Sequence, residues 1–291
     1  MYKEAIQDAI STNELPAEWS SALLSEAEHV AQKKKTAKYR KDLRKLPFVT
    51  IDGEDAKDFD DAIYCVKNTS GYRLYVAIAD VSFYVEANSK LDKEAKKRGT
   101  SIYFPETVIP MLPENLSNGI CSLRPNEDRC SMICEMSIDL DGTRKKYKFY
   151  SGLINSKARL TYNQVEKHFK KSSSIKQSIV RESIKHLFDL TNVRLKLRNQ
   201  RRALEINPTE AILELNKNKE VNNIVIKKNL FAHKLVEESM LLANESAAEF
   251  MHDRLDLGVY RIHEDPDPSK LETLKKHFKV PAQIAKKSSP L

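Results

Sequence analysis

The sequence is poor in glycine and cysteine and has no long apolar run. Its seven glycines include no Gly-rich phosphate loop, so a nucleotide cofactor is not expected. Its four cysteines are spaced too irregularly for a disulfide framework, and we expect reduced thiols in the core. No segment approaches the roughly eighteen apolar residues of a membrane span, and the N-terminal MYKEAIQDAI is not a signal sequence. These absences predict a cytoplasmic protein without a membrane partner.

Positive charge is in excess and unevenly distributed. The 291 residues carry a formal net charge of +8. The stretch AQKKKTAKYRKDLRK holds eight basic residues against one aspartate, and RLKLRNQRR forms a second cluster. Such clusters attract polyanions through phosphate contacts, which favours a nucleic-acid partner. A lysine-rich helix is more often only a solvated surface, so charge alone leaves this question open.

The hydrophobic pattern changes from a strand period to a helix period along the chain. After a helical, basic lead-in region at residues 1–45, the main domain is expected at residues 46–291. Its first half predicts strands with two hairpin turns, and its second half predicts long helices around one further strand pair. The expected strands are 46–51, 62–66, 72–79, 130–140, 144–154, 211–215 and 221–227, and the expected helices are 164–169, 175–201 and 229–255. The predicted fold class is α+β (mixed α/β), a largely antiparallel sheet with long helices packed on it.

Six carboxylates and one lysine are crowded between Asp52 and Asp61, in the stretch DGEDAKDFDD. Two apolar runs that read as strands flank this stretch. Extended backbone would place Asp58 and Asp60 on one side and Asp61 on the other. Two like charges at close range repel by about 1 kcal/mol in water, and by more where they are partly buried. Converging carboxylates therefore require a cation, strong hydrogen bonds or protonation.

Three interpretations of this acidic stretch are possible. Carboxylate oxygens are the ligands that magnesium prefers, so a magnesium site is favoured. Calcium fits less well, because Gly53 and Ile63 stand at the wrong positions for an EF-hand loop. The remaining interpretation is an exposed acidic turn without a ligand, which suits a strand–loop–strand with apolar flanks poorly.

Four ordered blocks carry a resemblance to a known family. They are TIDGEDAKDFDDAIY, YVAIADVSFYV, RGTSIYFPETVIPMLPENLSNGICSL and AHKLVEESMLLANESAA. With them, the chain resembles the RNB catalytic domain of the ribonuclease II family, in its bacterial ribonuclease R form, from about Arg40 to His277. The resemblance implies a 3′-to-5′ exoribonuclease that hydrolyses RNA processively to nucleoside 5′-monophosphates. The implied cofactor is two magnesium ions, and the implied partner is the 3′ end of single-stranded RNA.

The resemblance also assigns the acidic residues. By the family motif, Asp52, Asp58 and Asp61 would mainly bind and organise magnesium. Asp60 would also be a ligand and would be the residue most directly tied to cleavage. Glu54 and Asp55 fall outside the motif.

Three further positions are implied to contact RNA. Tyr103 matches the family tyrosine that packs on the terminal nucleotide and helps to set where cleavage falls. Glu237 matches a glutamate that contacts RNA near its 3′ end. Ile206 stands where the family has a phenylalanine that helps to clamp the last base. Because an aliphatic side chain offers no π face, a weaker grip on that base is expected.

The family has a later arginine-containing block of the form TSPIRRYPDL, which these 291 residues do not contain. The arginine would stabilise charge at the scissile phosphate, and such groups contribute several kcal/mol to catalysis. The expectation is therefore a fragment of the catalytic domain, truncated at its C-terminus, with reduced or no activity. The alternatives are a catalytically inactive RNA-binding remnant, or a domain too incomplete to fold stably.

Overall fold

The computed structural model describes residues 2–33, 38–105, 107–171, 175–201, 211–216, 220–226, 229–255, 258, 260 and 262–278. The chain forms two compact units, Met1–Ala247 and Ala248–Leu291. The second unit contains the last turns of α6 (Phe231–Leu255) and the helix α7 (Pro268–Phe278). Within the described residues, no helix has the length and apolar character needed to cross a membrane.

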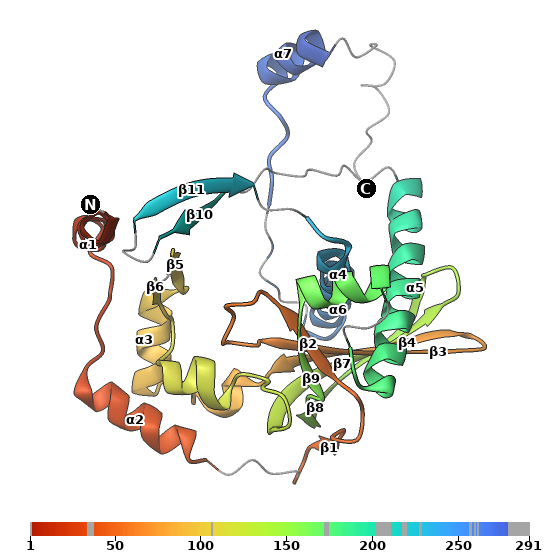
Figure 1. The fold of residues 1–291 in the computed structure, drawn as a ribbon, viewed down its shortest axis with the longest axis horizontal. Coiled ribbons are helices and arrows are strands. Elements are labelled where there is room, and N and C mark those ends of the chain that lie inside the picture. Colours follow the sequence, from red (N-terminus) through yellow and green to blue (C-terminus); the bar gives the residue numbers. More distant parts are fainter. Residues whose placement is uncertain are drawn as a thin grey trace. The chain divides into compact units, whose positions relative to one another are not determined.

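A seven-stranded sheet lies at the centre of the first unit (Figure 1). The strand order is β1-β8-β7-β4-β3-β2-β9, and all pairs are antiparallel except β1 with β8 and β2 with β9. The strands are β1 (Lys41–Asp42), β2 (Val49–Asp52), β3 (Asp61–Asn68), β4 (Gly71–Ala79), β7 (Asp128–Asp139), β8 (Arg144–Asn155) and β9 (Ala158–Thr161). The expected mixed α/β class with a largely antiparallel sheet is confirmed.

Both predicted hairpins of this sheet form at the predicted turns. The β3–β4 turn ends at Gly71, with φ +146°, and the β7–β8 turn contains Gly142, with φ +87°. Residues with a side chain rarely adopt this left-handed region, so glycine permits both turns. At Gly142 a Cβ atom would also lie 2.9 Å from the Val193 side chain. The turn thus packs closely against α5 (Ser178–Gln200).

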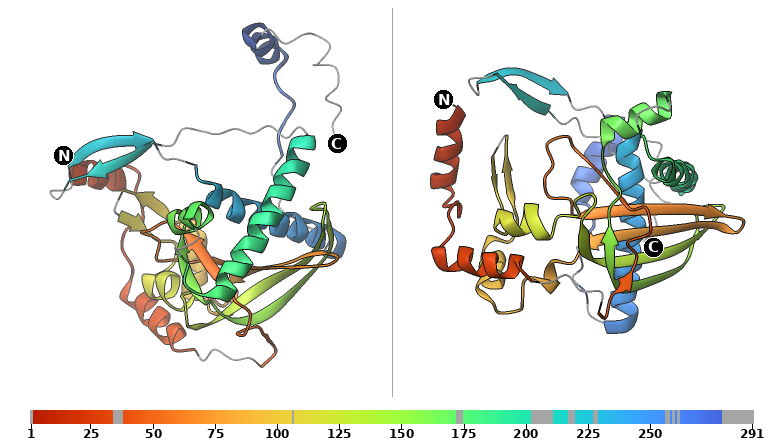
Figure 2. Two further views of the ribbon diagram at one scale, coloured as in Figure 1. Left: turned by 45° about the vertical axis from the view of Figure 1, so that its right-hand side comes forward. Right: turned by 60° about the horizontal axis from the view of Figure 1, so that its bottom comes forward.

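Helices cover one face of the sheet. There α4 (Tyr162–Lys171), α5 and the start of α6 pack on the strands, and α5 lies against them in both views of Figure 2. The shared core includes Ile63 and Leu74 from the sheet and Ile184 and Leu235 from the helices, all at most 1% exposed. The apolar faces predicted for the long helices therefore make the main core.

Smaller elements pack against another part of the sheet, at Cys130 of β7 and Leu153 of β8. They are α2 (Ser21–Ala31), α3 (Lys90–Arg98) and the π-helical turn η2 (Asn115–Ile120). Their core includes Ala27, Leu91 and Leu116. A two-stranded ribbon, β5 (Ile102–Phe104) and β6 (Thr107–Ile109), joins this layer between α3 and η2 along the chain. Sequence patterns did not predict α3, η2, β5 or β6.

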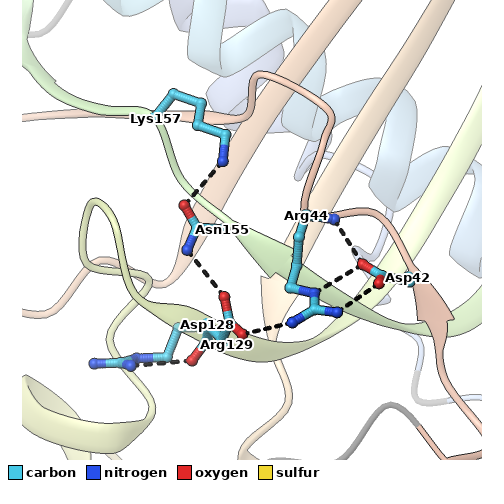
Figure 3. Close-up of polar contacts among 6 residues, drawn as sticks. All are labelled: Asp42, Arg44, Asp128, Arg129, Asn155 and Lys157. Carbon is cyan, nitrogen blue, oxygen red and sulfur yellow. Dashed lines mark hydrogen bonds and ion pairs between the residues drawn. The ribbon is translucent and has the colours of Figure 1, made fainter.

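The predicted lead-in region forms α1 (Tyr2–Thr12) and α2, and its last residues join the sheet. Arg44 bridges Asp42 in β1 (2.6 Å) and Asp128 in β7 (3.0 Å), as Figure 3 shows. Asn155 of β8 donates to the same Asp128 carboxylate at 2.9 Å and accepts from Lys157 at 3.0 Å. This polar network holds β1 beside β8. A domain boundary at residue 45 stays a prediction.

The largest differences from the predicted element boundaries are at two starts. The first predicted strand begins at Val49 instead of Leu46, because the Leu46 carbonyl accepts the Phe48 N–H in a turn. The helix expected from Ile175 begins at Ser178. The strand pair β10 (Ala211–Leu215) and β11 (Val221–Ile226) forms as predicted.

Candidate active site

The acidic stretch forms a loop between two strands of the sheet. Asp52 ends β2 and Asp61 begins β3. Two hydrogen bonds to Ser122 fix the loop. The Ser122 Oγ atom accepts from the Phe59 N–H at 3.0 Å and donates to the Lys57 carbonyl at 2.9 Å. The Phe59 side chain is buried in the core. Because alternate residues of extended chain point to opposite sides, Asp58 and Asp60 face away from that core.

Ser122 is itself held by a buried arginine. Arg129, which is 3% exposed, donates Nε to the Ser122 carbonyl at 2.7 Å. Its remaining guanidinium donors bond the carbonyls of Asp128 and Gly119 and the carboxylate of Glu127. The acidic loop is therefore supported by a buried network whose hydrogen bonds are all formed, which favours one loop conformation.

A second arginine holds the other end of the loop. Arg159 of β9 donates to the Gly53 carbonyl at 2.8 Å and also to the Glu54 carbonyl. Asn163 at the start of α4 donates to the Glu54 carboxylate at 2.9 Å. The parallel pairing of β2 with β9 brings these residues together, since Thr50 lies opposite Arg159. The backbone that carries the aspartates is thus fixed at both ends.

The loop forms one wall of a pocket of about 1000 Å³. Asp52, Asp58 and Asp60 line it, and Tyr103 of β5 lies on another wall. The Tyr103 side chain is 66% exposed, and its hydroxyl donates to Asp58 Oδ2 at 3.3 Å. Predicted site residues that are 45 positions apart therefore meet at one pocket. Asp61 is not among the lining residues, in accordance with the predicted alternation.

Negative charge dominates the pocket. Its lining contains six carboxylates and one lysine, a formal charge of −5. The acidic members are Asp52, Glu54, Asp55, Asp58, Asp60 and Glu114. Lys57 forms no ion pair within the described part of the chain. A phosphate group would be repelled from this pocket unless cations neutralised it.

The carboxyl groups show the electrostatic cost of this arrangement. Burial, and then the charges of Asp52 and Asp60, raise the pKa of Asp61 to about 6. Partial burial in the pocket is the main cause of the raised pKa of Asp60, although its side chain is still exposed to solvent. The negative charges of Asp58 and Asp52 raise this pKa further. Burial also raises the pKa of Asp52, against a hydrogen bond from the Gly53 N–H. Each raised pKa shows that the charged carboxylate is disfavoured in this pocket, and a nearby cation would favour the charged form.

The residues present fit a divalent metal in their chemistry. The Oδ2 atom of Asp61 is buried and has no hydrogen-bond partner among the described residues, which is costly for a carboxylate unless a cation binds it. In the part of the chain that is described, however, no three His, Cys, Asp or Glu side chains are grouped closely enough to hold a metal. Magnesium tolerates this, since it keeps several waters and uses few carboxylates. Asp52, Asp58, Asp60 and Asp61 are the residues that would hold it.

Comparison with known proteins identifies the family. Residues 40–289 match the RNB domain. The chain belongs to the RNB domain family. It is 44% identical to ribonuclease R of Escherichia coli over 270 residues, which cover 90% of this chain and 33% of that protein. The RNB chain thus spans about a third of the length of this curated relative.

Solved structures support the fold of this RNB chain. The structure of Mycoplasma genitalium RNase R in complex with ribose-methylated single-stranded RNA has a TM-score of 0.88 at 34% identity, and covers 94% of this chain and 43% of that one. Yeast Ssd1, a pseudonuclease, has a TM-score of 0.66 at 18% identity, and covers 91% of this chain and 31% of that one. The second likeness concerns the fold alone. Because a pseudonuclease has this fold, activity has to be argued from the site residues.

Of the two other predicted RNA contacts of the RNB chain, only Glu237 is described, and it lies outside the pocket. Glu237 of α6 is paired with Arg198 of α5 at 2.7 Å and with Lys234 at 3.1 Å, and it does not line the acidic pocket. These partners lower its pKa against the effect of burial. Ile206 lies outside the described residues. Both assignments stay predictions.

The sequence did not reveal the residues that support the RNB pocket. Arg159, Arg129 and Ser122 act largely through backbone carbonyl and N–H groups, which no side-chain pattern displays. A buried arginine flanked by strand residues was the only signal available. The role of each residue depends on the folded position of the acidic loop.

Proposed function

We propose that the acidic pocket is the active site of a 3′-to-5′ exoribonuclease that hydrolyses single-stranded RNA to nucleoside 5′-monophosphates. The observation that carries the proposal is the convergence of Asp52, Asp58, Asp60 and Tyr103 on one pocket. Asp61, next to Asp60 in the chain, adds a buried carboxylate oxygen that has no hydrogen-bond partner in the described part of the chain. The family and its RNA-bound member support RNA as the substrate. We expect the protein to act in the cytoplasm, and to act processively.

The side chains would divide the work by position. Bound magnesium would neutralise the scissile phosphate and provide an activated water. Asp52, Asp58, Asp60 and Asp61 would hold the ions, and two ions are expected. Asp60 lies exposed in the pocket and would orient the reacting groups. The exposed ring of Tyr103 would stack on the terminal base, which typically contributes about 1–3 kcal/mol per base.

The test is cleavage of RNA labelled at its 5′ end by the purified chain in magnesium. The labelled RNA should shorten from its 3′ end to a short end product without accumulated intermediates, and 5′-mononucleotides should be released. A low rate is expected, because these residues do not contain the arginine block of the family. Asp60→Asn should slow the reaction by more than about 100-fold, because the metal site contributes several kcal/mol. Asp55→Asn is the matched control, since Asp55 lines the same pocket outside the motif, and it should change the rate only a few-fold.

Three results would decide against the proposal. Equal rates for the wild type and Asp60→Asn would place cleavage elsewhere. Degradation of circular RNA would exclude an exonuclease. Tight RNA binding without cleavage in magnesium would instead support an RNA-binding role for these residues.

A further inference from the structure

Part of the sheet face opposite α5 carries basic side chains. On the face opposite α5, the cross-strand register places Arg73 of β4, Ser137 of β7 and Lys146 of β8 in one row. The next row contains Tyr64, Tyr75, Glu135 and Lys148. Residues directly opposite on neighbouring strands point to the same face of a sheet. These two rows therefore carry Arg73, Lys146 and Lys148 beside Tyr75, which belongs to the core.

These basic side chains are exposed, and the one carboxylate among them, Glu135, already has partners. The side chains of Arg73 and Lys41 are 48% and 56% exposed, and Lys146 and Lys148 are exposed as well. Glu135 is only 14% exposed. Its carboxylate accepts from the Tyr150 hydroxyl at 2.7 Å and lies 3.6 Å from both Lys41 and Arg73.

We call Lys41, Arg73, Lys146 and Lys148 the basic sheet surface. Four cations face one carboxylate, so the surface has an excess of three positive charges. Lys146 and Lys148 form no ion pair or side-chain hydrogen bond with other described residues. Their ammonium groups are available to an external anion.

The basic sheet surface is separate from the acidic pocket. Arg73 pairs with Val66, five residues along β3 from Asp61, which corresponds to about 16 Å of strand. None of its four residues lines the pocket. The two regions also have opposite charge, so they would attract different ligands.

We propose that the basic sheet surface is a second RNA-binding site, which holds the phosphate backbone of single-stranded RNA without magnesium and without reading sequence. Charge complementarity supports this ligand, because exposed lysine and arginine side chains bind phosphates by releasing counterions. The choice of RNA among polyanions rests on the proposed function. The binding itself does not depend on cleavage in the pocket.

The strand edge provides a competing role for the same lysines. β1 pairs only with Gly152 and Leu153 of β8, so the described strands leave residues 144–150 without a partner on their outer side. Lysines on such an edge oppose aggregation between strands. This role predicts that loss of the lysines causes association and leaves RNA affinity unchanged.

The experiment measures RNA affinity by fluorescence anisotropy in EDTA, over a series of salt concentrations. The triple variant Arg73→Gln, Lys146→Gln and Lys148→Gln should lower the slope of log affinity against log salt by about 2, since each single-strand phosphate contact contributes about 0.7. With affinities equal at about 1 M salt, this loss makes binding about 100-fold weaker at about 0.1 M. The double variant at Lys146 and Lys148 should lose about 1.4 from the slope and serves if the triple variant does not fold.

The matched control removes the same charge from another surface. Lys90, Lys93 and Lys97 are exposed on α3, and their triple glutamine variant should keep the wild-type slope. An equal loss in this control would show that RNA responds only to net charge, and would overturn the proposal. So would unchanged affinity in the first variant, with or without aggregation. Asp60→Asn should bind RNA in EDTA like the wild type, so failure of the proposed cleavage and failure of this site give different results.

Discussion

Replacing Asp61 with asparagine is expected to stabilise the metal-free protein at neutral and alkaline pH. The Asp61 side chain is mostly buried at the start of β3, and no residue that the structure describes forms a hydrogen bond with its Oδ2 atom. Burial and two neighbouring carboxylates raise its pKa from 3.8 to about 6. A shift of about 2 units corresponds to about 3 kcal/mol of destabilisation when the group is charged. Asparagine has nearly the same shape and no charge, so a gain of about 2–3 kcal/mol is expected.

The sign of the pH dependence follows from the raised pKa. The folded protein binds the Asp61 proton more tightly than the unfolded chain does, so its stability falls as pH rises between 3.8 and about 6. The full cost is present above about 6 and is absent below 3.8. The advantage of the variant should therefore be largest near pH 8 and should shrink towards pH 5. Magnesium should stabilise the wild type more than the variant, because the added cation offsets the same charge.

Urea unfolding in EDTA at the two pH values measures this difference. Asp141→Asn is the control, because a hydrogen bond from the Thr143 N–H lowers the pKa of Asp141, and its charge is not a cost. This control should give no gain in stability. The reasoning is refuted if Asp61→Asn is less stable than the wild type near pH 8, or if the difference between them does not change with pH.

Three further substitutions test the support of the acidic loop and the ion pairs between α5 and α6. Arg159→Lys should weaken magnesium binding about tenfold with little change in thermal stability, because it loses one charged hydrogen bond of about 1.5 kcal/mol that fixes the acidic loop. Calorimetric titration would measure this, and unchanged affinity would show that the loop does not need the second bond. Arg198→Met should lower the free energy of unfolding by about 1.5–3 kcal/mol, because it removes a charged hydrogen bond to Glu238, which is 2% exposed and keeps Arg194 at 3.5 Å. Glu237→Gln, at the more exposed partner of the same arginine, should cost less than about 1 kcal/mol, and equal losses in thermal melts would contradict this account.

Local sequence chemistry predicted the antiparallel part of the fold. The Asp141-Gly142 turn and the turn before Gly71 connect strands that are adjacent in the chain, and their glycines permit positive φ. The parallel pairs could not be found in this way. Lys41 lies opposite Gly152 and Val49 lies opposite Ala158, across more than a hundred residues, with no turn between them to display the pairing. The position of Arg159 beside the acidic loop depends on one of these pairs.

The candidate site was predictable where its chemistry lies in side chains. A dense run of carboxylates between two strands indicates a cation site from repulsion alone, and alternation separated Asp61 from Asp58 and Asp60. The family resemblance was needed to connect Tyr103 with that loop, since nothing local relates them. Physical pattern could not reveal that Glu237 is already paired with Arg198 and Lys234, because an ion pair between helices depends on their packing.

The charge distribution constrains the order in which RNA can be bound. The pocket carries a formal charge of −5, while the basic sheet surface has an excess of three positive charges. Without divalent cations, RNA phosphates are attracted to the surface and repelled from the pocket. Neutralisation of the aspartates removes the repulsion and lets the terminal nucleotide approach Tyr103. It follows that RNA binding in EDTA should depend on Arg73, Lys146 and Lys148 and not on Tyr103, whereas a contribution of Tyr103 should appear only when magnesium is added.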